Sequence, residues 1–326
     1  MTRTASLCTA SATGILALAV VGLVVGDFPV PAREALATAI WDRGSEFDFV
    51  VNSLRFPRVV VAVLAGICLA VSGALFQTLI DNPLVSPDII GIDTGAAAMA
   101  VAVLALGLDT RLLPYAAFAG AVGTAGLIFV LSWRRGFSGG RLVLVGIGIN
   151  ALLTAVITYM LVRFPIERVS AAARWQAGTL SASSWGDART LAIGMALLVP
   201  AAFLLIRQLR VMQLGDDTAI ALGVGLEPSR LTVIIVGCGL AATVVAVVGP
   251  LGFVALLVPH VARALAGAFS GGVLLLTALL GAVMLLSADL VAQRLFAPTV
   301  LPAGVVTAAM GGPYLLFVLR RFNRAA

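Results

Sequence analysis

Ten long apolar runs, separated by polar segments, dominate the pattern of hydrophobic and polar positions along the chain. A helix of about 20 uncharged residues, rising about 1.5 Å per residue, crosses a hydrocarbon core of about 30 Å. Because the apolar positions are continuous rather than alternating, the pattern predicts membrane helices and argues against a β-barrel. The runs cover approximately residues 10–26, 57–79, 88–107, 112–132, 142–162, 190–206, 231–248, 250–265, 271–292 and 303–319.

This pattern predicts an all-α polytopic membrane protein with about ten transmembrane helices, in one domain that covers residues 1–326. The first run follows Arg3 and could belong to a signal peptide. No small-x-small cleavage pattern follows Gly26, so we expect an anchor helix instead. The least distinct boundary, between the seventh and eighth runs, falls at Gly249 and Pro250.

Composition supports the same class. Hydrophobic residues make up 61% of the chain and charged residues 11%, with a mean hydropathy of +1.10. Soluble domains carry about 25% charged residues, so this chain has too few to cover a water-facing surface. Its 34 glycines suit close helix packing in lipid.

Three longer polar segments interrupt the apolar pattern, and we expect outer loops at about 27–54 and 163–189 and a cytoplasmic segment at about 207–230. The first outer loop could hold a short amphipathic helix at 32–41. The cytoplasmic segment is interpreted as two short helices broken at Gly223 and Gly225. A structured, amphipathic connector of this length is typical of a docking element.

Arginine supplies all 21 basic residues, and its distribution predicts the orientation. The densest clusters, in SWRRGFSGGR and in the tail VLRRFNRAA, favour a cytoplasmic location for both termini. The arginines are nevertheless divided almost evenly between the two sides. The outer arginines therefore need an explanation of their own.

Few residues could carry catalysis or bind a metal. Cys8, Cys68 and Cys238 are far apart in or near apolar runs, which favours a packing role. His260 is the only histidine and lacks the partners of a metal site. Since the chain contains no lysine, it cannot hold a Gly-Lys-Ser/Thr phosphate loop, and ATP hydrolysis would require another subunit.

Several long segments carry a family resemblance: RFPRVVVAVLAGICLAVSGALFQTLIDNPLVSPDIIGIDTGA, LGDDTAIALGVGLEPSRL, GPLGFVALLVPHVARALAG, ADLVAQRL and LPAGVVTAAMGGPYLLFVLRR. In order and spacing, from about residue 30 to the C-terminus, they resemble the FecCD-type permeases. These are the membrane subunits of type II ABC importers for ferric siderophores, haem and cobalamin. The resemblance implies a non-enzymatic, multi-pass subunit of the bacterial inner membrane, with ten helices.

The same resemblance implies the partners. A second permease, either an identical copy or a homologue, would complete a pathway lined by spans 2, 5 and 8–10. Two ATPase subunits would bind ATP and Mg²⁺ below it, and a substrate-binding protein would dock above it. No cofactor is expected on this chain itself, and no nucleic acid.

At the outer surface, Arg55 and Arg58 flank Pro57 and match family positions that bind acidic residues of the binding protein, as does Arg294. The alternative for each is ordinary interfacial snorkelling. Docking would explain the excess of outer arginines. Exposed ion pairs contribute only about 0–1 kcal/mol each, so these arginines would mainly steer the partner and set its register.

At the inner surface, the resemblance implies two sites. Asn82, Pro83 and Leu84 form a turn in which the proline stops the helix, and in the family this turn narrows the cytoplasmic end of the pathway. The segment 215–225 matches the coupling helices that insert into the ATPase, and an amphipathic helix lying on the membrane is the alternative. The coupling candidates are Asp217, Ala219, Leu222 and Gly223.

Two other classes of function compete with this one. An ion-coupled carrier usually places carboxylates within its spans, whereas Asp88, Asp93 and Asp289 lie near span ends. A membrane enzyme would need a nucleophile–base pair, paired acids or a metal site. For the cargo, a ferric siderophore is preferred, with haem and cobalamin as the alternatives.

Overall fold

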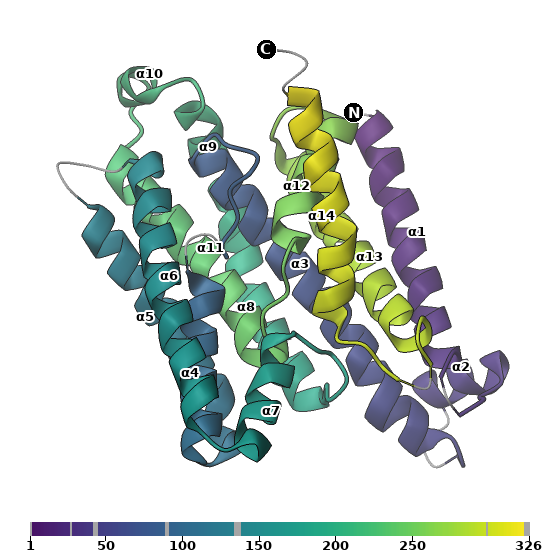
Figure 1. The fold of residues 1–326 in the computed structure, drawn as a ribbon. Coiled ribbons are helices and arrows are strands. Elements are labelled where there is room, and N and C mark those ends of the chain that lie inside the picture. Colours follow the sequence, from purple (N-terminus) through teal and green to yellow (C-terminus); the bar gives the residue numbers. More distant parts are fainter. Residues whose placement is uncertain are drawn as a thin grey trace.

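The computed structural model describes residues 2–26, 28–41, 45–88, 91–133, 138–297 and 299–322. Within these ranges the chain forms helices and no strands (Figure 1). The elements are α1 (Thr2–Val24), α2 (Ala32–Ile40), the π-helix η1 (Phe49–Arg55), α3 (Phe56–Leu79), α4 (Ile92–Leu106), the 3₁₀ helix η2 (Thr110–Leu112), α5 (Leu113–Ser132), α6 (Gly139–Arg163), α7 (Ile166–Gln176), α8 (Trp185–Leu204), α9 (Ile206–Met212), α10 (Asp216–Ala221), α11 (Leu226–Val248), α12 (Val254–Ala266), α13 (Gly271–Arg294) and α14 (Ala303–Phe322).

Ten of these helices account for the ten predicted apolar runs: α1, α3, α4, α5, α6, α8, α11, α12, α13 and α14. Seven helical segments in the described part of the chain are long and apolar enough to cross a membrane. The apolar parts of α4, α12 and α14 are shorter, between 10 and 17 residues. The all-α membrane fold predicted from the sequence is therefore confirmed.

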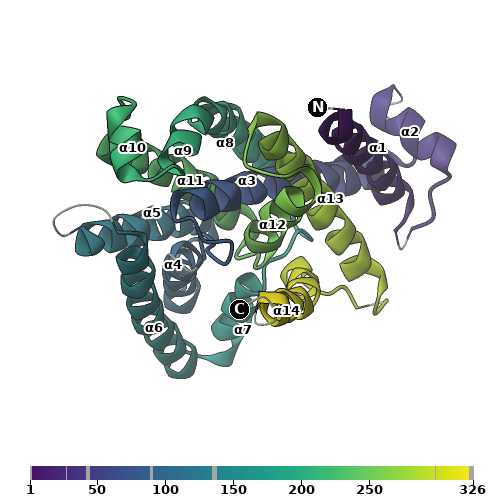
Figure 2. The same cartoon turned by 90° about the horizontal axis from the view of Figure 1, so that it is seen from above.

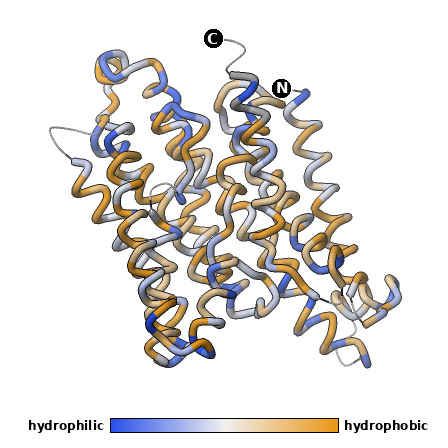
Figure 3. The backbone as a smooth tube through the Cα atoms, in the orientation of Figure 1, coloured by the Kyte–Doolittle hydropathy of each residue, from blue (hydrophilic) through white to orange (hydrophobic). Residues whose placement is uncertain are grey.

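The polar segments gather at the two ends of the bundle. The first turn of α1 and the last turn of α14 lie on the same side as α9 and α10, here named the α10 end, whereas α2 and α7 lie at the opposite α7 end (Figure 1). Hydrophilic residues concentrate at these two ends and apolar residues between them (Figure 3). This arrangement agrees with the expected grouping of the termini with the 207–230 segment. Arg134, Arg135 and Arg324, which contributed to the predicted orientation, lie outside the described residues.

Two boundaries differ from the prediction. The second span does not begin at residue 57, because η1 runs directly into α3 and extends the helix back to Phe49. In the 207–230 segment the two short helices are α9 and α10, and the break between them lies at Gly215, with φ at 98°. Gly223 and Gly225 instead separate α10 from α11.

The core is built around α3, which crosses the middle of the bundle with α8 and α11 on one side and α12 and α13 on the other (Figure 2). α3 and α13 approach most closely at Gly66 and Gly281, where a Cβ on either glycine would overlap the other's backbone carbonyl. Small residues thus allow the backbones to touch, which is how helices associate in lipid.

Candidate functional site

The 81–84 turn follows directly from the way α3 ends. Asp81 adopts the left-handed conformation, with φ at 51°, and the Asn82 N–H donates to the Gln77 carbonyl at 3.1 Å. This is the bond pattern of a Schellman C-cap, in which a short polar residue such as aspartate tolerates the left-handed position. The Asn82 side-chain oxygen then accepts from the Leu84 N–H at 2.9 Å. The turn is therefore a compact unit held by hydrogen bonds of its own backbone and of the Asn82 side chain.

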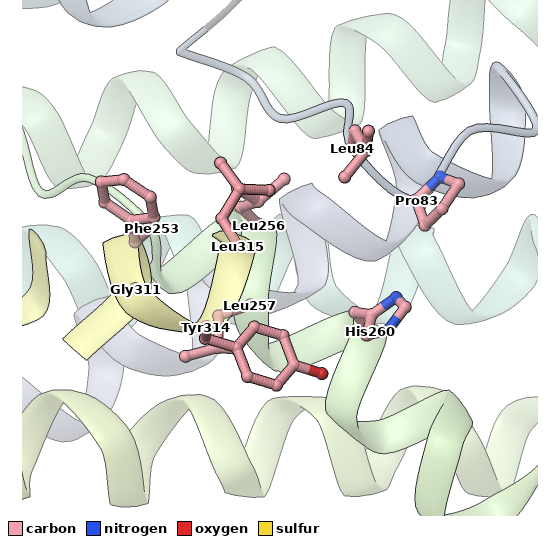
Figure 4. A pocket seen from close by; sticks show the side chains of 9 residues that line it. All are labelled: Pro83, Leu84, Phe253, Leu256, Leu257, His260, Gly311, Tyr314 and Leu315. Carbon is pink, nitrogen blue, oxygen red and sulfur yellow. The ribbon is translucent and has the colours of Figure 1, made fainter. Parts of the chain in front are cut away.

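On one side of this turn lies an apolar pocket. Pro83 and Leu84 approach α12 and α14, and the void left between them measures about 10 Å³, room for no more than about one water molecule. Figure 4 shows the phenol of Tyr314 directed toward His260, and the two ring centroids are 5.9 Å apart. The other lining residues are Phe253, Leu256, Leu257, Gly311 and Leu315.

On the other side lies a larger polar pocket of about 380 Å³. Its lining residues are Gln77, Asp81, Asn82, Pro83, Gln213, His260, Arg263 and Ala264. Pro83 and His260 line both pockets, and we call these two side chains the partition between the narrow apolar pocket and the wider polar one. An apolar constriction of this kind resists wetting and can act as a gate.

The outer arginines make bonds within the chain. The guanidinium of Arg55 donates to the carbonyls of Leu23 and Val24 at 2.8 and 2.9 Å, and to that of Phe28 at 2.5 Å. It thereby satisfies carbonyl groups at the C-terminus of α1, where a positive charge is favourable. A docking role was predicted for Arg55. In the structure its guanidinium is used within the chain, where it holds the end of α1 against the start of α3.

Arg58 forms a buried ion pair. Its Nε and NH2 groups donate to the two carboxylate oxygens of Asp289, each at 2.8 Å, and only 15% of the Arg58 side chain and 2% of the Asp289 side chain are exposed. Gln293 donates to the same carboxylate at 2.9 Å. Arg294, in the last turn of α13, is exposed at the α7 end.

The predicted coupling segment forms a short projection at the α10 end (Figure 1). Asp217 is exposed, and Gly223 takes a left-handed φ of 80° that ends α10. Ala219 is fully buried within this chain and cannot itself offer contact surface. The exposed apolar surface comes from Leu222, as predicted, and from Ile220, which the sequence reasoning missed; the two are 61% and 60% exposed. In the sequence, the two large apolar residues Ile220 and Leu222 within the 215–225 segment could have indicated the exposed surface.

The remaining candidate groups are possible metal ligands and the cysteines. In the part of the chain that is described, no three His, Cys, Asp or Glu side chains are grouped so that they could hold a metal ion. Cys68 and Cys238 are buried in α3 and α11.

Fold and sites together define a polytopic helical membrane protein with a narrow apolar constriction toward one end and a projecting helical element at that end. A model of the FecCD transport family matches residues 14–321, and the chain belongs to this family.

Individual transport proteins are similar to this chain over most of its length. The chain is 41% identical over 304 residues to the ferric enterobactin transport system permease protein FepG of Escherichia coli (strain K12), with 93% of this chain and 92% of FepG covered. It is 37% identical over 308 residues to the Fe(3+)-citrate import system permease protein YfmE of Bacillus subtilis (strain 168), with 94% and 92% covered. A solved metal-chelate type ABC transporter in an inward-facing conformation matches with a TM-score of 0.88 at 27% identity, over 97% of this chain and 99% of the other.

Proposed function

We propose that this chain is the permease subunit of an ABC importer that carries a ferric chelate, preferably a ferric siderophore, across the bacterial inner membrane. The observation that carries the proposal is the 41% identity to FepG over nearly the whole of both chains. The second relative is also named for the import of a ferric chelate. Haem and cobalamin are the alternative cargoes.

In this proposal the α10 end faces the cytoplasm. Two separate ATPase subunits bind ATP and Mg²⁺ there and contact α10 through Leu222 and Ile220, with Asp217 and Gly223 shaping the contact and Ala219 supporting it from within. The large exposed apolar side chains on so short a helix support this assignment, since water is an unfavourable environment for them. A second permease, identical or homologous, completes the pathway.

The 81–84 turn is the cytoplasmic gate of this pathway, with Asn82 holding the turn and Pro83 and Leu84 closing it. The support is the near-absence of space between this turn and α12 and α14. Chelate passage then requires the turn to separate from these helices. No chemical step takes place on the cargo, and the whole chelate is carried, because this chain supplies no group of iron ligands among its described residues.

At the α7 end, we assign docking of the substrate-binding protein chiefly to Arg294, whose side chain is exposed. Arg55 and Arg58 contribute to that surface mainly by fixing the helices that form it, since both guanidinium groups are bonded inside the chain. In this proposal all three arginines belong to the docking surface, but Arg294 contacts the binding protein while Arg55 and Arg58 hold the helices in place.

Transport can be tested in proteoliposomes that contain this chain, its partner ATPase and binding protein, and any second permease. Uptake of labelled ferric siderophore, haem and cobalamin is compared with and without ATP. ATP-dependent accumulation of the ferric siderophore is the expected result. Accumulation of only haem or cobalamin would replace the cargo, and accumulation driven by an ion gradient alone would refute the proposal.

A further inference from the structure

Gln77, near the end of α3, is bonded to the 81–84 turn and to α12 at the same time. Its backbone carbonyl accepts the Asn82 N–H at 3.1 Å. Its side-chain Nε2 donates to the Leu256 carbonyl at 2.9 Å, and its Oε1 accepts a hydrogen bond from the guanidinium of Arg263. Only 2% of Gln77 is exposed, so its polar atoms depend on these partners rather than on water.

The sequence of α12 explains why α3 can approach it so closely. Pro259 lies inside α12 and has no N–H, so it cannot donate to the carbonyl of Ala255 one turn earlier. Gly73 of α3 lies against that carbonyl, and a Cβ at this position would overlap it. Gly73 and Gln77 are four residues apart and therefore share one face of α3. The two helices are thus in contact along a full turn that ends at the 81–84 turn.

Arg263 of α12 adds a side-chain hydrogen bond, to Gln77, to this contact between α3 and α12. It lies three residues after His260, and both side chains line the polar pocket below the partition. Asp81 lines the same pocket and places a carboxylate near the guanidinium. The bond from Arg263 to Gln77 is charge-assisted and partly buried, which makes it stronger than a bond between neutral groups.

We infer that Arg263 is a positioning residue of the gate: through Gln77 it holds the end of α3, and with it the 81–84 turn, against His260 of α12. This inference rests on the gate assignment in the proposed function. It adds a specific latch, Gln77–Arg263, that keeps the constriction closed at rest. Opening requires the latch to break, so that the 81–84 turn can separate from α12.

A cysteine placed behind the gate can report on the latch. Leu257 lines the narrow apolar pocket and not the polar one, and the space there is about 10 Å³, so a Leu257→Cys thiol should react slowly with a membrane-impermeant maleimide added from the cytoplasmic side. The permease–ATPase complex is used without cargo in sealed inside-out membrane vesicles, in which the cytoplasmic side faces the added reagent. The background has Cys8, Cys68 and Cys238 replaced by alanine.

In this background, Arg263→Met should raise the labelling rate about tenfold, in keeping with the loss of one charge-assisted hydrogen bond. Gln77→Leu removes that bond and also the bond to the Leu256 carbonyl, so it should raise the rate by at least as much. The double variant should be no faster than Gln77→Leu alone, because the bond between the two side chains is already lost in that variant. Arg263→Lys, which keeps a charged donor, should restore much of the protection. The matched control is Arg207→Met, an exposed arginine of α9 at the same end, which should label at the parental rate.

Labelling at the parental rate in both single variants, or effects that multiply in the double variant, would overturn the latch. If Arg263→Met does not fold, Gln77→Asn provides the same test, since it shortens the amide by one methylene and keeps it polar. Because the assay needs no cargo, its outcome is separate from that of the transport experiment. A wild-type complex that moves no chelate would refute the proposed function while leaving the latch measurement intact.

Discussion

Removal of Asp289 should destabilise the protein, because its carboxylate is the partner of a largely buried arginine. In the Asp289→Ala variant, Arg58 would keep its charge between α3 and α13 but lose both 2.8 Å bonds. Gln293 would lose its acceptor as well. The substitution therefore leaves one charged and one amide side chain without their observed partners.

The expected cost can be estimated from the exposure of the pair. Breaking a buried ion pair by removing one partner costs about 3–5 kcal/mol. Because 15% of the Arg58 side chain is exposed, its guanidinium can shift partly toward water, and the lower end of about 3 kcal/mol is appropriate. That value lowers the folding equilibrium constant by about a hundredfold. By the scaling for folded domains, the melting temperature should fall by about 6–12 °C.

Thermal unfolding in detergent of three variants provides the assay. Asp289→Ala should show the full loss, whereas Arg58→Met combined with Asp289→Leu should lie close to the wild type, since apolar replacement of a buried pair is often neutral. Asp289→Asn should fall between them. An Asp289→Ala protein that melts with the wild type would refute the reasoning.

The apolar double variant also separates folding from docking. A charge reversal at Arg58 alone would place two carboxylates side by side, so a resulting loss of uptake could come from misfolding. The double variant keeps the fold and removes the arginine. If its binding-protein affinity is unchanged, Arg58 has no direct part in docking; a tenfold loss in a stable protein would assign it one.

Three further outcomes are expected. Gly66→Leu should prevent the close contact with Gly281 and reduce the yield of folded protein in size-exclusion chromatography, whereas Gly123→Leu, with open space around its Cβ, should not. Gly223→Trp should abolish ATPase co-purification and uptake, because its left-handed φ and the small surface are both lost; normal transport would remove the coupling assignment. Arg294→Glu should slow binding-protein association, most clearly at low salt, and equal rates at low and high salt would contradict a docking charge.

The sequence predicted the helices well because one physical demand governs them. Any segment in lipid must satisfy its backbone internally, so each apolar run becomes a helix whatever it packs against. The ten runs follow from this logic. The surface helix expected at 32–41 is found as α2, but the predicted stop at the proline is not where α3 ends, because the helix finishes at Leu79 with the left-handed Asp81, before Pro83 is reached. The π-helical start at Phe49 does not follow from this logic, because it depends on packing against α1 and α2 rather than on an apolar pattern.

The hydrogen bonds and ion pairs of the candidate sites were less predictable than the helices, because the residues that form them are far apart in the sequence. Arg58 and Asp289 are 231 positions apart, and the Gln77–Arg263 bond joins residues 186 positions apart. No periodicity or spacing marks such pairs. The motif around His260 was visible in the sequence, but its link to the 81–84 turn depends on how α12 lies against α3.

The structure also resolves part of the puzzle posed by the outer arginines. The prediction placed Arg55 and Arg58 at the outer mouth of a second span that begins at residue 57, whereas the helix that contains both begins at Phe49. One of them holds the C-terminus of α1, and the other neutralises Asp289. Each is thus required by a helix packing interaction at the α7 end. Their presence there does not oppose a cytoplasmic α10 end, because loop charge, not buried pairing, carries the orientation signal.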